Sequence, residues 1–522
     1  MSGADAEVPV LIVGGGPVGL TARALLGRWG VPALLVDKRR ELSPFPRSRL
    51  VNVRSMEIFR QLGIAEKITA DAFAPEYGRV RFRDTLYDPD FAGAVMVGVR
   101  APVPESPVVG VVTSQDRLEP TLLAAPGGEV RFGTGLVALE ADADGVLAVL
   151  VDAGRGAETR VRARYVIAAD GANSTVRKLL GIGTAGPGTL GDYTTVVFDA
   201  DLARWCAHQP AGVYFTAFGT FAPLYPEGGW AWFGPRPEGT GRAGWPGHVA
   251  HALGSAAGVR ADVVRVQHWS MTAYVAESFR RGRILLAGDA AHAVPPIGGL
   301  GMNAGVADAH NLSWKLAGVL QGWAGTDLLE TYETERQPVA RETLRQAVAN
   351  TRLLLQAQNL RREQLRGGAA APVEPPWSQR YFAQLGLVLG TAYDSAAVLR
   401  DDDRPEAFGT EYVPTARPGH RMPHHWLSPG RSTLDTLGEW FTVLTPDPGR
   451  WPRRAAGPWP LRVEPLPGEH AGRYGLSPHG GALLVRPDGH IAARWDDPPP
   501  SGSALRDALT AVTSCAAGRC SP

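Results

Sequence analysis

The sequence is poor in the features that mark secreted, membrane-spanning and nucleic-acid-binding proteins. Its 522 residues include three cysteines, too few for the disulfide network of a small secreted domain. They contain no apolar run long enough to cross a bilayer and no basic and apolar leader. The 53 basic side chains are matched by 52 acidic ones, so no charge surplus favours nucleic-acid phosphates. We therefore expect a cytoplasmic globular protein without membrane or nucleic-acid partners.

A glycine-rich turn follows the first predicted strand. Residues 8–13 form an apolar run, and Gly14, Gly16 and Gly19 come directly after it, in front of a helical stretch. Glycines at this spacing let the backbone turn tightly and approach a pyrophosphate, which the N-terminus of the helix then stabilises. Asp37 ends the next predicted strand, where a carboxylate can accept hydrogen bonds from ribose hydroxyls. This βαβ unit predicts a site for FAD or NAD rather than for NADP.

A second loop, residues 288–305, combines two prolines with several glycines. Asp289 ends a predicted strand, where its carboxylate can accept a hydrogen bond from a sugar or ribityl hydroxyl. Pro295 and Pro296 stiffen the loop, while the glycines after them let the backbone lie close to a ligand. The predicted helix that begins near Met302 directs its positive N-terminus at that ligand. Such a loop suits a reduced flavin, which carries negative charge around N1 and C2=O.

Three stretches resemble, in this order, the fingerprints of the single-component FAD-dependent aromatic hydroxylases, the group similar to para-hydroxybenzoate and phenol hydroxylases. They are GGGPVG at 14–19, AADGANSTVR at 168–177 and GDAAHAVPPIGGLGMNAG at 288–305. Alone, the Asp170-Gly171 pair in the second stretch would predict only a turn. The resemblance covers nearly the whole chain, and it is strongest to the branch that modifies polycyclic aromatic natural products such as polyketides.

The resemblance implies a set of residues that bind FAD. They are Gly14, Gly16, Pro17, Gly19, Asp37, Lys38, Arg47, Gln115, Asp170, Gly171, Asp289, Pro296, Gly299, Leu300, Gly301, Met302 and Asn303. No catalytic base is required, because the flavin carries the chemistry. His292 is the only candidate for such a base, and in this motif the residue usually packs or caps. No metal site is expected.

The fold that the resemblance implies is α/β, with two interleaved domains and a third after them. The parts are a Rossmann-like FAD-binding domain (1–75, 108–190 and 281–366), a substrate-binding domain on an antiparallel sheet (76–107 and 191–280) and a C-terminal thioredoxin-like domain (377–522). The third lacks the Cys-x-x-Cys of a redox-active thioredoxin. We therefore expect it to have a structural role or to support a homodimer.

Aromatic residues are dense in the predicted antiparallel sheet, and we expect some of them to line a substrate pocket. The candidates are Phe215, Phe221, Tyr225 and Trp232, together with Pro295 of the glycine-rich loop.

The reaction that the resemblance implies is hydroxylation of a small aromatic substrate. NADPH or NADH reduces the flavin, O2 adds at its C4a atom, and the hydroperoxide transfers one oxygen atom to an electron-rich, polycyclic ring. Two alternatives stay open. One is Baeyer–Villiger oxygenation of a polycyclic ketone on the same scaffold, and the other is a non-catalytic flavoprotein that binds a pathway intermediate.

Overall fold

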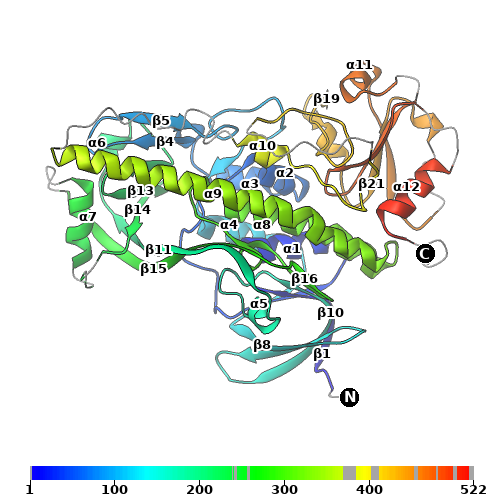
Figure 1. Ribbon diagram of the computed structural model, residues 1–522, viewed down its shortest axis with the longest axis horizontal. Coiled ribbons are helices and arrows are strands. Elements are labelled where there is room, and N and C mark those ends of the chain that lie inside the picture. The colour runs from blue at the N-terminus through cyan, green and yellow to red at the C-terminus, as the bar shows by residue number, and fades with distance from the viewer. Residues whose placement is uncertain are drawn as a thin grey trace.

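The computed structural model describes residues 3–515, apart from 238, 240, 242–243, 255–258, 368–383, 401–410, 452–456, 478–479 and 498–502. Both ends of the predicted C-terminal domain, 377–383 and 516–522, lie outside the described residues. Two eight-stranded sheets and one four-stranded sheet organise the described chain (Figure 1). Helices pack between and around them, so the expectation of a mixed α/β fold is confirmed. Within the described ranges, no helix is both long and apolar enough to span a membrane.

The first sheet is largely parallel and has the order β16-β17-β10-β1-β2-β7, with β9 paired to β10 and β8 paired to β9. Its strands are β1 (Ala6–Val13), β2 (Ala33–Asp37), β7 (Glu129–Phe132), β8 (Thr134–Ala141), β9 (Val146–Asp152), β10 (Glu158–Ala168), β16 (Arg280–Arg281) and β17 (Ile284–Leu286). The end of β1, all of β2 and the end of β10 are buried apolar runs, as central parallel strands require.

Helices cover this sheet, and α1 packs against both β1 and the long helix α8. The helices of this part are α1 (Pro17–Arg28), α2 (Val53–Gln61), α3 (Ala65–Ala70), α4 (Gln115–Ala124), α5 (Thr175–Leu179) and α8 (Leu300–Gln321). The last of them ends at Gly322, whose left-handed backbone terminates the helix.

The second sheet is mostly antiparallel and has the order β18-β15-β11-β14-β13-β12-β4-β5. Its strands are β4 (Arg79–Phe82), β5 (Ala92–Val95), β11 (Thr184–Asp199), β12 (Val213–Thr216), β13 (Gly219–Tyr225), β14 (Gly228–Pro235), β15 (Asp262–Ala276) and β18 (His292–Ala293). The long strands β11 and β15 carry it away from the first sheet, and α6 (Ala203–Cys206) and α7 (Trp245–Leu253) lie at its far end (Figure 1).

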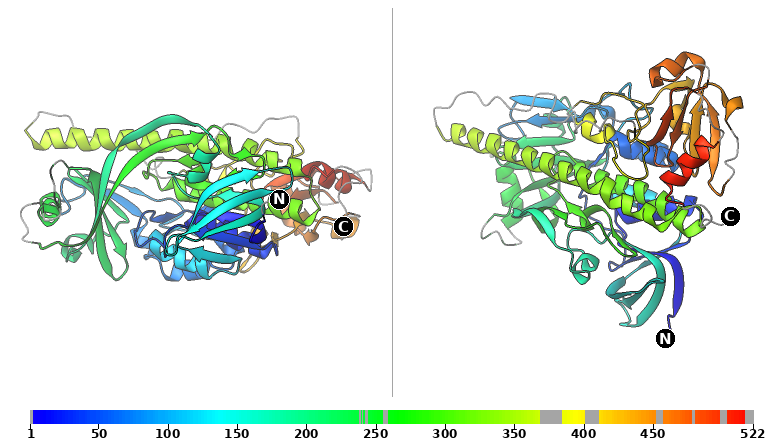
Figure 2. Two further views of the ribbon diagram at one scale, coloured as in Figure 1. Left: turned by 90° about the horizontal axis from the view of Figure 1, so that it is seen from below. Right: turned by 45° about the vertical axis from the view of Figure 1, so that its right-hand side comes forward.

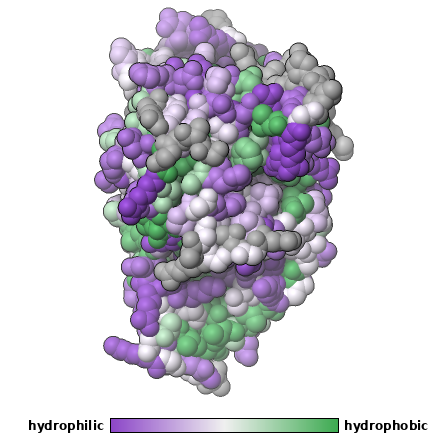
Figure 3. Space-filling model, turned by 90° about the vertical axis from the view of Figure 1, so that its left-hand side faces the viewer, coloured by the Kyte–Doolittle hydropathy of each residue, from purple (hydrophilic) through white to green (hydrophobic). Residues whose placement is uncertain are grey.

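One face of the second sheet is a closed core rather than a pocket wall. Tyr214, Phe221 and Trp232 are cross-strand neighbours, so their side chains share a face. Trp245 of α7 packs into the same buried cluster. Figure 3 views this end of the molecule from outside, where hydrophilic and hydrophobic residues are interspersed. We expected Phe221 and Trp232 to line the substrate pocket. They lie instead in this core, in the same cluster as Trp245 of α7.

The C-terminal sheet has the order β22-β21-β23-β24. Its strands are β21 (Phe441–Thr445), β22 (Leu461–Pro465), β23 (Ala482–Val485) and β24 (Ile491–Trp495), and its helices are α11 (Gly468–Ala471) and α12 (Ala504–Val512). β21 runs parallel to β22 and antiparallel to β23, which in turn is antiparallel to β24. Phe441 of β21 packs edge-on against Trp314 of α8, which joins this sheet to the first domain.

Helix α9 (Glu330–Leu365) spans the molecule from the C-terminal sheet to the second sheet (Figures 1 and 2). At one end, Glu335 pairs with Arg486 of the C-terminal region at 2.6 Å. At the other end, Arg361 donates a 2.7 Å hydrogen bond to Asp84, beyond β4. Helix α9 therefore connects the C-terminal region with the part of the chain that forms the second sheet.

Candidate active site

The stretches that the sequence singles out meet at one edge of the first sheet. The glycine turn follows β1, Asp37 ends β2, Asp170 follows β10 and Asp289 follows β17. Because these strands are parallel neighbours, their carboxyl ends lie together. Ligands of open α/β sheets bind at this edge.

Two glycines of the turn, Gly14 and Gly19, are packed too closely for a side chain. A Cβ on Gly14 would lie 2.2 Å from the Ala169 carbonyl oxygen, and a Cβ on Gly19 would lie 1.9 Å from that of Gly14. Gly16 precedes α1 and Pro17 opens it, and no side chain caps the helix. The uncapped N-terminus of α1 therefore fits the phosphate site that the sequence predicts.

Asp37 lies beside this turn, but its carboxylate is already engaged by protein groups. It accepts hydrogen bonds from the Gly15 amide at 2.7 Å and from the Arg39 guanidinium at 2.8 Å. Burial alone would raise the pKa of Asp37, yet these bonds hold it below its ordinary value. Arg39 was not foreseen, although it follows two residues later. Lys38 is exposed, and strand alternation directs it away from Asp37.

Arg47 lies at the same edge of the sheet, close to several charged side chains. Burial and Arg39 lower the pKa of its guanidinium, while three carboxylates raise it. Those carboxylates are Glu119, Asp289 and Asp37. The side-chain amide of Gln115 is already engaged, because it donates a 2.7 Å hydrogen bond to Glu119. Glu119, a fully buried acid that the sequence analysis missed, therefore orients Gln115.

Asp289 is deep in the fold and yet open to solvent. Its side chain is exposed, whereas burial by the surrounding protein raises the pKa of its carboxyl. Tyr274 fixes the backbone by donating a 2.7 Å hydrogen bond to the Asp289 carbonyl. A Cβ on Gly288 would come within 2.8 Å of Val18 in α1, so the turn can approach α1 only as glycine. A carboxylate that solvent can reach, although protein atoms surround it, is typical of a ligand cavity.

The glycine-rich loop ends on the N-terminus of α8. Gly299 has a left-handed backbone, and a Cβ on it would lie 2.9 Å from Leu50. Asn303 donates hydrogen bonds to the carbonyls of Leu50 at 2.9 Å and Gly299 at 2.7 Å, and accepts one from the Asn52 amide. The helix begins at Leu300, two residues before the predicted start. Pro295 and Leu300 are buried, while Pro296, Gly301 and Met302 keep exposed surface.

The Asp170-Gly171 turn supports the Asp289 turn through its neighbours. Asp170 accepts hydrogen bonds from Ser174 at 2.5 Å and from the start of α5, and Gly171 has a positive φ of 81°. Arg177, on α5, donates a 2.8 Å hydrogen bond to Tyr274, which in turn holds the Asp289 backbone. The Asp170-Gly171 turn and α5 thereby help to hold the backbone at Asp289 in place.

The side chain of His292 lies inside the fold. Its side chain is fully buried, and its Nε2 lies 2.6 Å from Asp308 of α8. Asp308 also accepts hydrogen bonds from the Gly288 amide at 3.0 Å and from Arg336 at 2.7 Å. Burial opposes the charge of Asp308, but His292 and Arg336 hold its pKa at about 2. The side chain of His292 is therefore held inside the fold by Asp308.

A cleft of about 880 Å³ lies between the first and second sheets. Its walls include Arg40 and Phe132 from one side and Val197, Leu224 and Tyr225 from the other. This volume is within the range of sites for drug-sized molecules. Of the expected pocket residues, Tyr225 lines this cleft.

Two polar side chains, Tyr225 and Arg49, form hydrogen bonds near this cleft. Tyr225 donates a 2.6 Å hydrogen bond to Asp116 of α4. Arg49 donates hydrogen bonds to the carbonyls of Gly212, at 2.6 Å, and Pro223, and burial lowers its pKa to about 10. Sequence patterns did not reveal Arg49, because the strand to which it binds is distant in the chain.

Phe215 lies on the inner face of the second sheet. It stacks on Phe82 at 5.1 Å and shares a buried cluster with Ile297 of the glycine-rich loop. Of the four aromatic candidates, Phe215 and Tyr225 thus lie on the side that faces the first domain. In the described part of the chain, no group of three or more His, Cys, Asp or Glu side chains could hold a metal.

Comparisons with known proteins agree with this geometry. A family model described as an FAD binding domain matches residues 7–347, and one described as the C-terminal part of aromatic-ring hydroxylases matches residues 415–516. The chain is 36% identical to aklavinone 12-hydroxylase DnrF of Streptomyces peucetius, over 87% of this chain and 94% of the relative. It is 36% identical to tetracenomycin B2 monooxygenase-dioxygenase of Streptomyces olivaceus, over 97% of this chain and 98% of the relative.

A solved structure extends the similarity to three dimensions. The chain resembles aklavinone-11 hydroxylase, solved as a ternary complex with FAD and aklavinone, at a TM-score of 0.85 and 34% identity. The match covers 98% of this chain and 100% of that one.

Replacing Asp289 tests the cofactor site. We expect Asp289→Ala to weaken FAD binding by about tenfold or more, because a hydrogen bond to a charged group contributes about 1.5–3 kcal/mol. Asp289→Asn, which keeps one oxygen acceptor, should lose less. Flavin absorbance after purification and fluorescence titration of the apoprotein measure both variants. Full flavin occupancy in Asp289→Ala would contradict the assignment.

Two buried histidines, His310 in α8 and His490 in the C-terminal region, predict a pH dependence of stability. Burial, reinforced by Arg54, lowers the pKa of His310 to about 3, and burial lowers that of His490 to about 4. In the unfolded chain both would titrate near 6.5, so below that pH the unfolded state binds protons that the folded state does not. Their contribution is therefore complete above pH 6.5 and is lost as the pH falls toward 4, by about 1.4 kcal/mol per pH unit for each histidine.

Urea denaturation between pH 7.5 and 4.5 measures this slope. His310→Gln can still donate a hydrogen bond to Gln61, as His310 does at 2.8 Å, but it cannot titrate. Its free energy of unfolding should therefore fall less steeply with acid than that of the unaltered protein. Equal slopes would show that His310 is not held neutral.

Proposed function

The chain belongs to the FAD-binding aromatic-ring hydroxylases, and from this membership we propose that it is an NAD(P)H-consuming monooxygenase that hydroxylates a polycyclic aromatic compound. One observation supports this most: the charges of Asp37 and Asp289 both act on Arg47, and a Cβ on Gly301 at the start of α8 would lie 4.0 Å from the Asp289 carboxylate, at the sheet edge where α1 begins. A dinucleotide and a flavin ring need such a combination of phosphate cradle, open carboxylate and side-chain-free loop.

The residues present fit FAD. Gly14, Gly16 and Gly19 would hold the pyrophosphate, since added Cβ atoms on Gly14 and Gly19 would collide with backbone oxygens. Asp289 would accept hydrogen bonds from the ribityl chain, and residues 296–303 would lie along the ring. Asp37 would hold the adenosine ribose once Arg39 yields one of its contacts. Bound there, FAD would supply the redox chemistry that couples NADPH or NADH and O2 to the substrate.

For the substrate we propose a fused-ring phenol of the aromatic polyketide class. The names of two relatives refer to aklavinone and tetracenomycin, and a similar solved structure contains aklavinone. The cleft between the two sheets is large enough for such a molecule, and Tyr225 and Phe215 are aromatic surfaces on that side. The protein's own part is to orient the ring and exclude water.

The predicted domains follow as part of the same proposal. The first sheet lies mainly in the proposed Rossmann-like FAD-binding parts (1–75, 108–190 and 281–366), and the second lies mainly in the proposed substrate-binding parts (76–107 and 191–280). The second sheet also takes the start of β11 and all of β18 from the FAD-binding parts. A thioredoxin-like domain at 377–522 is supported by the strand order β22-β21-β23-β24, in which only the first pair is parallel. We expect the enzyme to act in the cytoplasm, and a homodimer is compatible with this function.

The proposal is tested by turnover with product analysis. The purified protein should show flavin absorbance bands and should oxidise NADPH or NADH faster when a hydroxyanthraquinone or a related polycyclic phenol is added. Mass spectrometry should find a product heavier by one oxygen atom, and its structure distinguishes a new phenol from the lactone of a Baeyer–Villiger reaction. Stoichiometric binding of the polycyclic compounds without stimulated oxidation would contradict the proposal and support a non-catalytic flavoprotein.

A further inference from the structure

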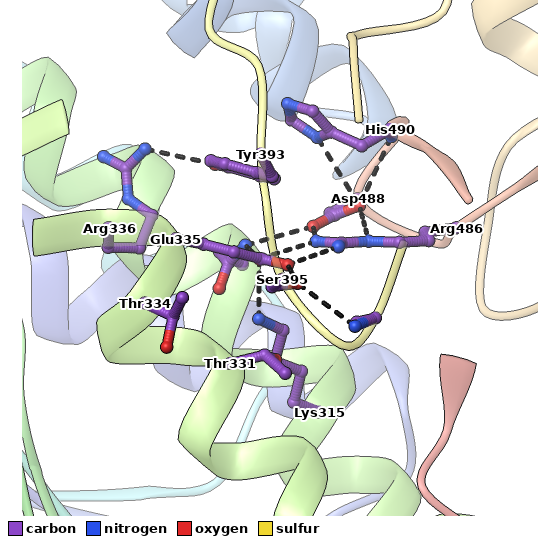
Figure 4. A network of polar contacts seen from close by, with 12 residues as sticks. Lys315, Thr331, Thr334, Glu335, Arg336, Tyr393, Ser395, Arg486, Asp488 and His490 are labelled. Atoms are coloured by element: carbon purple, nitrogen blue, oxygen red, sulfur yellow. Dashed lines mark hydrogen bonds and ion pairs between the residues drawn. The ribbon is translucent and has the colours of Figure 1, made fainter. Parts of the chain in front are cut away.

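Two adjacent residues of α9 face opposite parts of the molecule. In Figure 4, Glu335 points toward Arg486 of the C-terminal sheet, and Arg336 donates a 3.1 Å hydrogen bond to Tyr393. Arg336 also reaches Asp308 of α8. Both side chains are almost completely buried. Their adjacency in one helix means that neither can move far without displacing the other.

On the C-terminal side, Glu335 is the centre of a dense hydrogen-bond network (Figure 4). Arg486, in the turn between β23 and β24, donates two hydrogen bonds to it at 2.6 and 2.9 Å. Lys315 and Asn311 of α8 donate at 2.7 and 2.6 Å, and Ser395 donates at 2.6 Å. Burial would raise the pKa of Glu335, but Arg486 and Lys315 hold it well below its ordinary value.

On the other side, Arg336 reaches the turn that carries Asp289. Its guanidinium donates to Asp308 at 2.7 Å and to the Ala304 carbonyl of α8 at 3.1 Å. Asp308 in turn accepts the Gly288 amide at 3.0 Å. Gly288 directly precedes Asp289. Hydrogen bonds therefore link Arg336 to the backbone just before the candidate ribityl-binding residue, and the backbone of α9 joins Arg336 to Glu335, the partner of Arg486.

We propose that Arg486 of the C-terminal region is a positioning residue for the cofactor site, acting through Glu335, Arg336 and Asp308 on the turn at Gly288 and Asp289. This gives the C-terminal sheet, which lacks redox cysteines, a role in setting the geometry of the flavin loop. Only the identity of the ligand at that loop rests on the proposed function; the link between Arg486 and Gly288 does not.

The physical basis is the difficulty of leaving a buried charge without its partner. Removing Arg486 would leave Glu335 and Asp488 with one cation fewer, because Arg486 also donates to Asp488 at 3.1 Å. Buried ion pairs that lose one member are strongly destabilised, and the remaining groups move to regain partners or water. Arg486 also lies 5.3 Å from the ring of Tyr393, whose hydroxyl accepts a 3.1 Å hydrogen bond from Arg336. Movement at Arg486 would therefore pass through Tyr393 and the backbone of α9 to Arg336 and Asp308.

The chain offers a matched control at the same junction. Arg421 is another buried arginine of the C-terminal region, and it donates to Glu57 of α2 at 3.0 Å. Arg421→Met therefore also removes a buried cation between the same two parts of the molecule. It leaves the contacts of Glu335, Arg336 and Asp308 intact.

Hydrogen–deuterium exchange of the full-length apoprotein tests the proposal without any ligand. In Arg486→Met, we expect the amides of residues 285–293 to exchange at least about tenfold faster than in the unaltered protein, because the Gly288 amide loses a fixed acceptor. Arg421→Met should lower the thermal midpoint by a similar amount and leave exchange in this segment unchanged. Equal acceleration in both variants, or in neither, would overturn the proposal.

A second readout uses FAD itself. Arg486→Met should bind FAD at least about tenfold more weakly and show an altered visible circular dichroism spectrum of the bound flavin at saturation, while Arg486→Lys should restore most of both. Unchanged affinity and spectrum would overturn the proposal. If the unaltered protein bound no FAD, the proposed function would fail, and the exchange experiment would still decide the role of Arg486.

Should Arg486→Met fail to fold, the pair variant Arg486→Met with Glu335→Gln keeps the test decisive. Neutralising both members of a buried pair is far better tolerated than removing one, yet it still cuts the link to Arg336. Faster exchange at residues 285–293 is again the expected result, and protection equal to that of the unaltered protein would overturn the proposal.

Discussion

The carboxylate of Asp308 is the constraint on which the candidate site depends. It lies in α8 and binds the Gly288 amide, the His292 ring and the Arg336 guanidinium, all within the fully buried core. Its partners come from the turn after β17, from β18 and from α9. The position of α8, whose N-terminus closes the glycine-rich loop, is thereby fixed relative to the first sheet. Without this ion, the loop and the open carboxylate of Asp289 would have no fixed separation.

The same architecture explains why the opening combines rigidity with space. Parallel strands bring the motifs to one edge, and glycines at Gly14, Gly288 and Gly299 allow backbones to approach where any side chain would collide. The second sheet contributes its inner face to a cleft beside this edge and closes its outer face with α7. The proposed substrate site would lie in this cleft and the proposed cofactor site at the sheet edge, while the C-terminal sheet packs against α8 and α9.

Much of the cofactor site could be predicted from the sequence because its signals are local. A strand, a glycine turn and a helix lie within about thirty residues, and their spacing specifies the backbone conformation. The glycine-rich loop is equally local, and the structure begins its helix at Leu300, close to the expected position. The mixed α/β fold followed from the same motifs and from alternating apolar patterns.

The rest depended on contacts that spacing cannot reveal. Phe215 and Phe221 are both aromatic and lie in neighbouring strands, but only pairing register and the position of α7 decide which packs with Ile297 of the glycine-rich loop. Glu335 and Arg486 are 151 residues apart, and nothing near either residue indicates the other. Arg39 shows a further limit: the acid expected to bind ribose, Asp37, is shared with a neighbouring cation.

A crystal structure of the protein grown with FAD tests the central claim most directly. The account predicts that the pyrophosphate lies against Gly14 to Gly19, that the ribityl chain contacts Asp289, and that the ring lies along residues 296–303. Asp308 should keep its bonds to Gly288 and Arg336 in that structure. A flavin bound elsewhere, or bound in this opening without contact to Asp289 and the loop, would contradict the account.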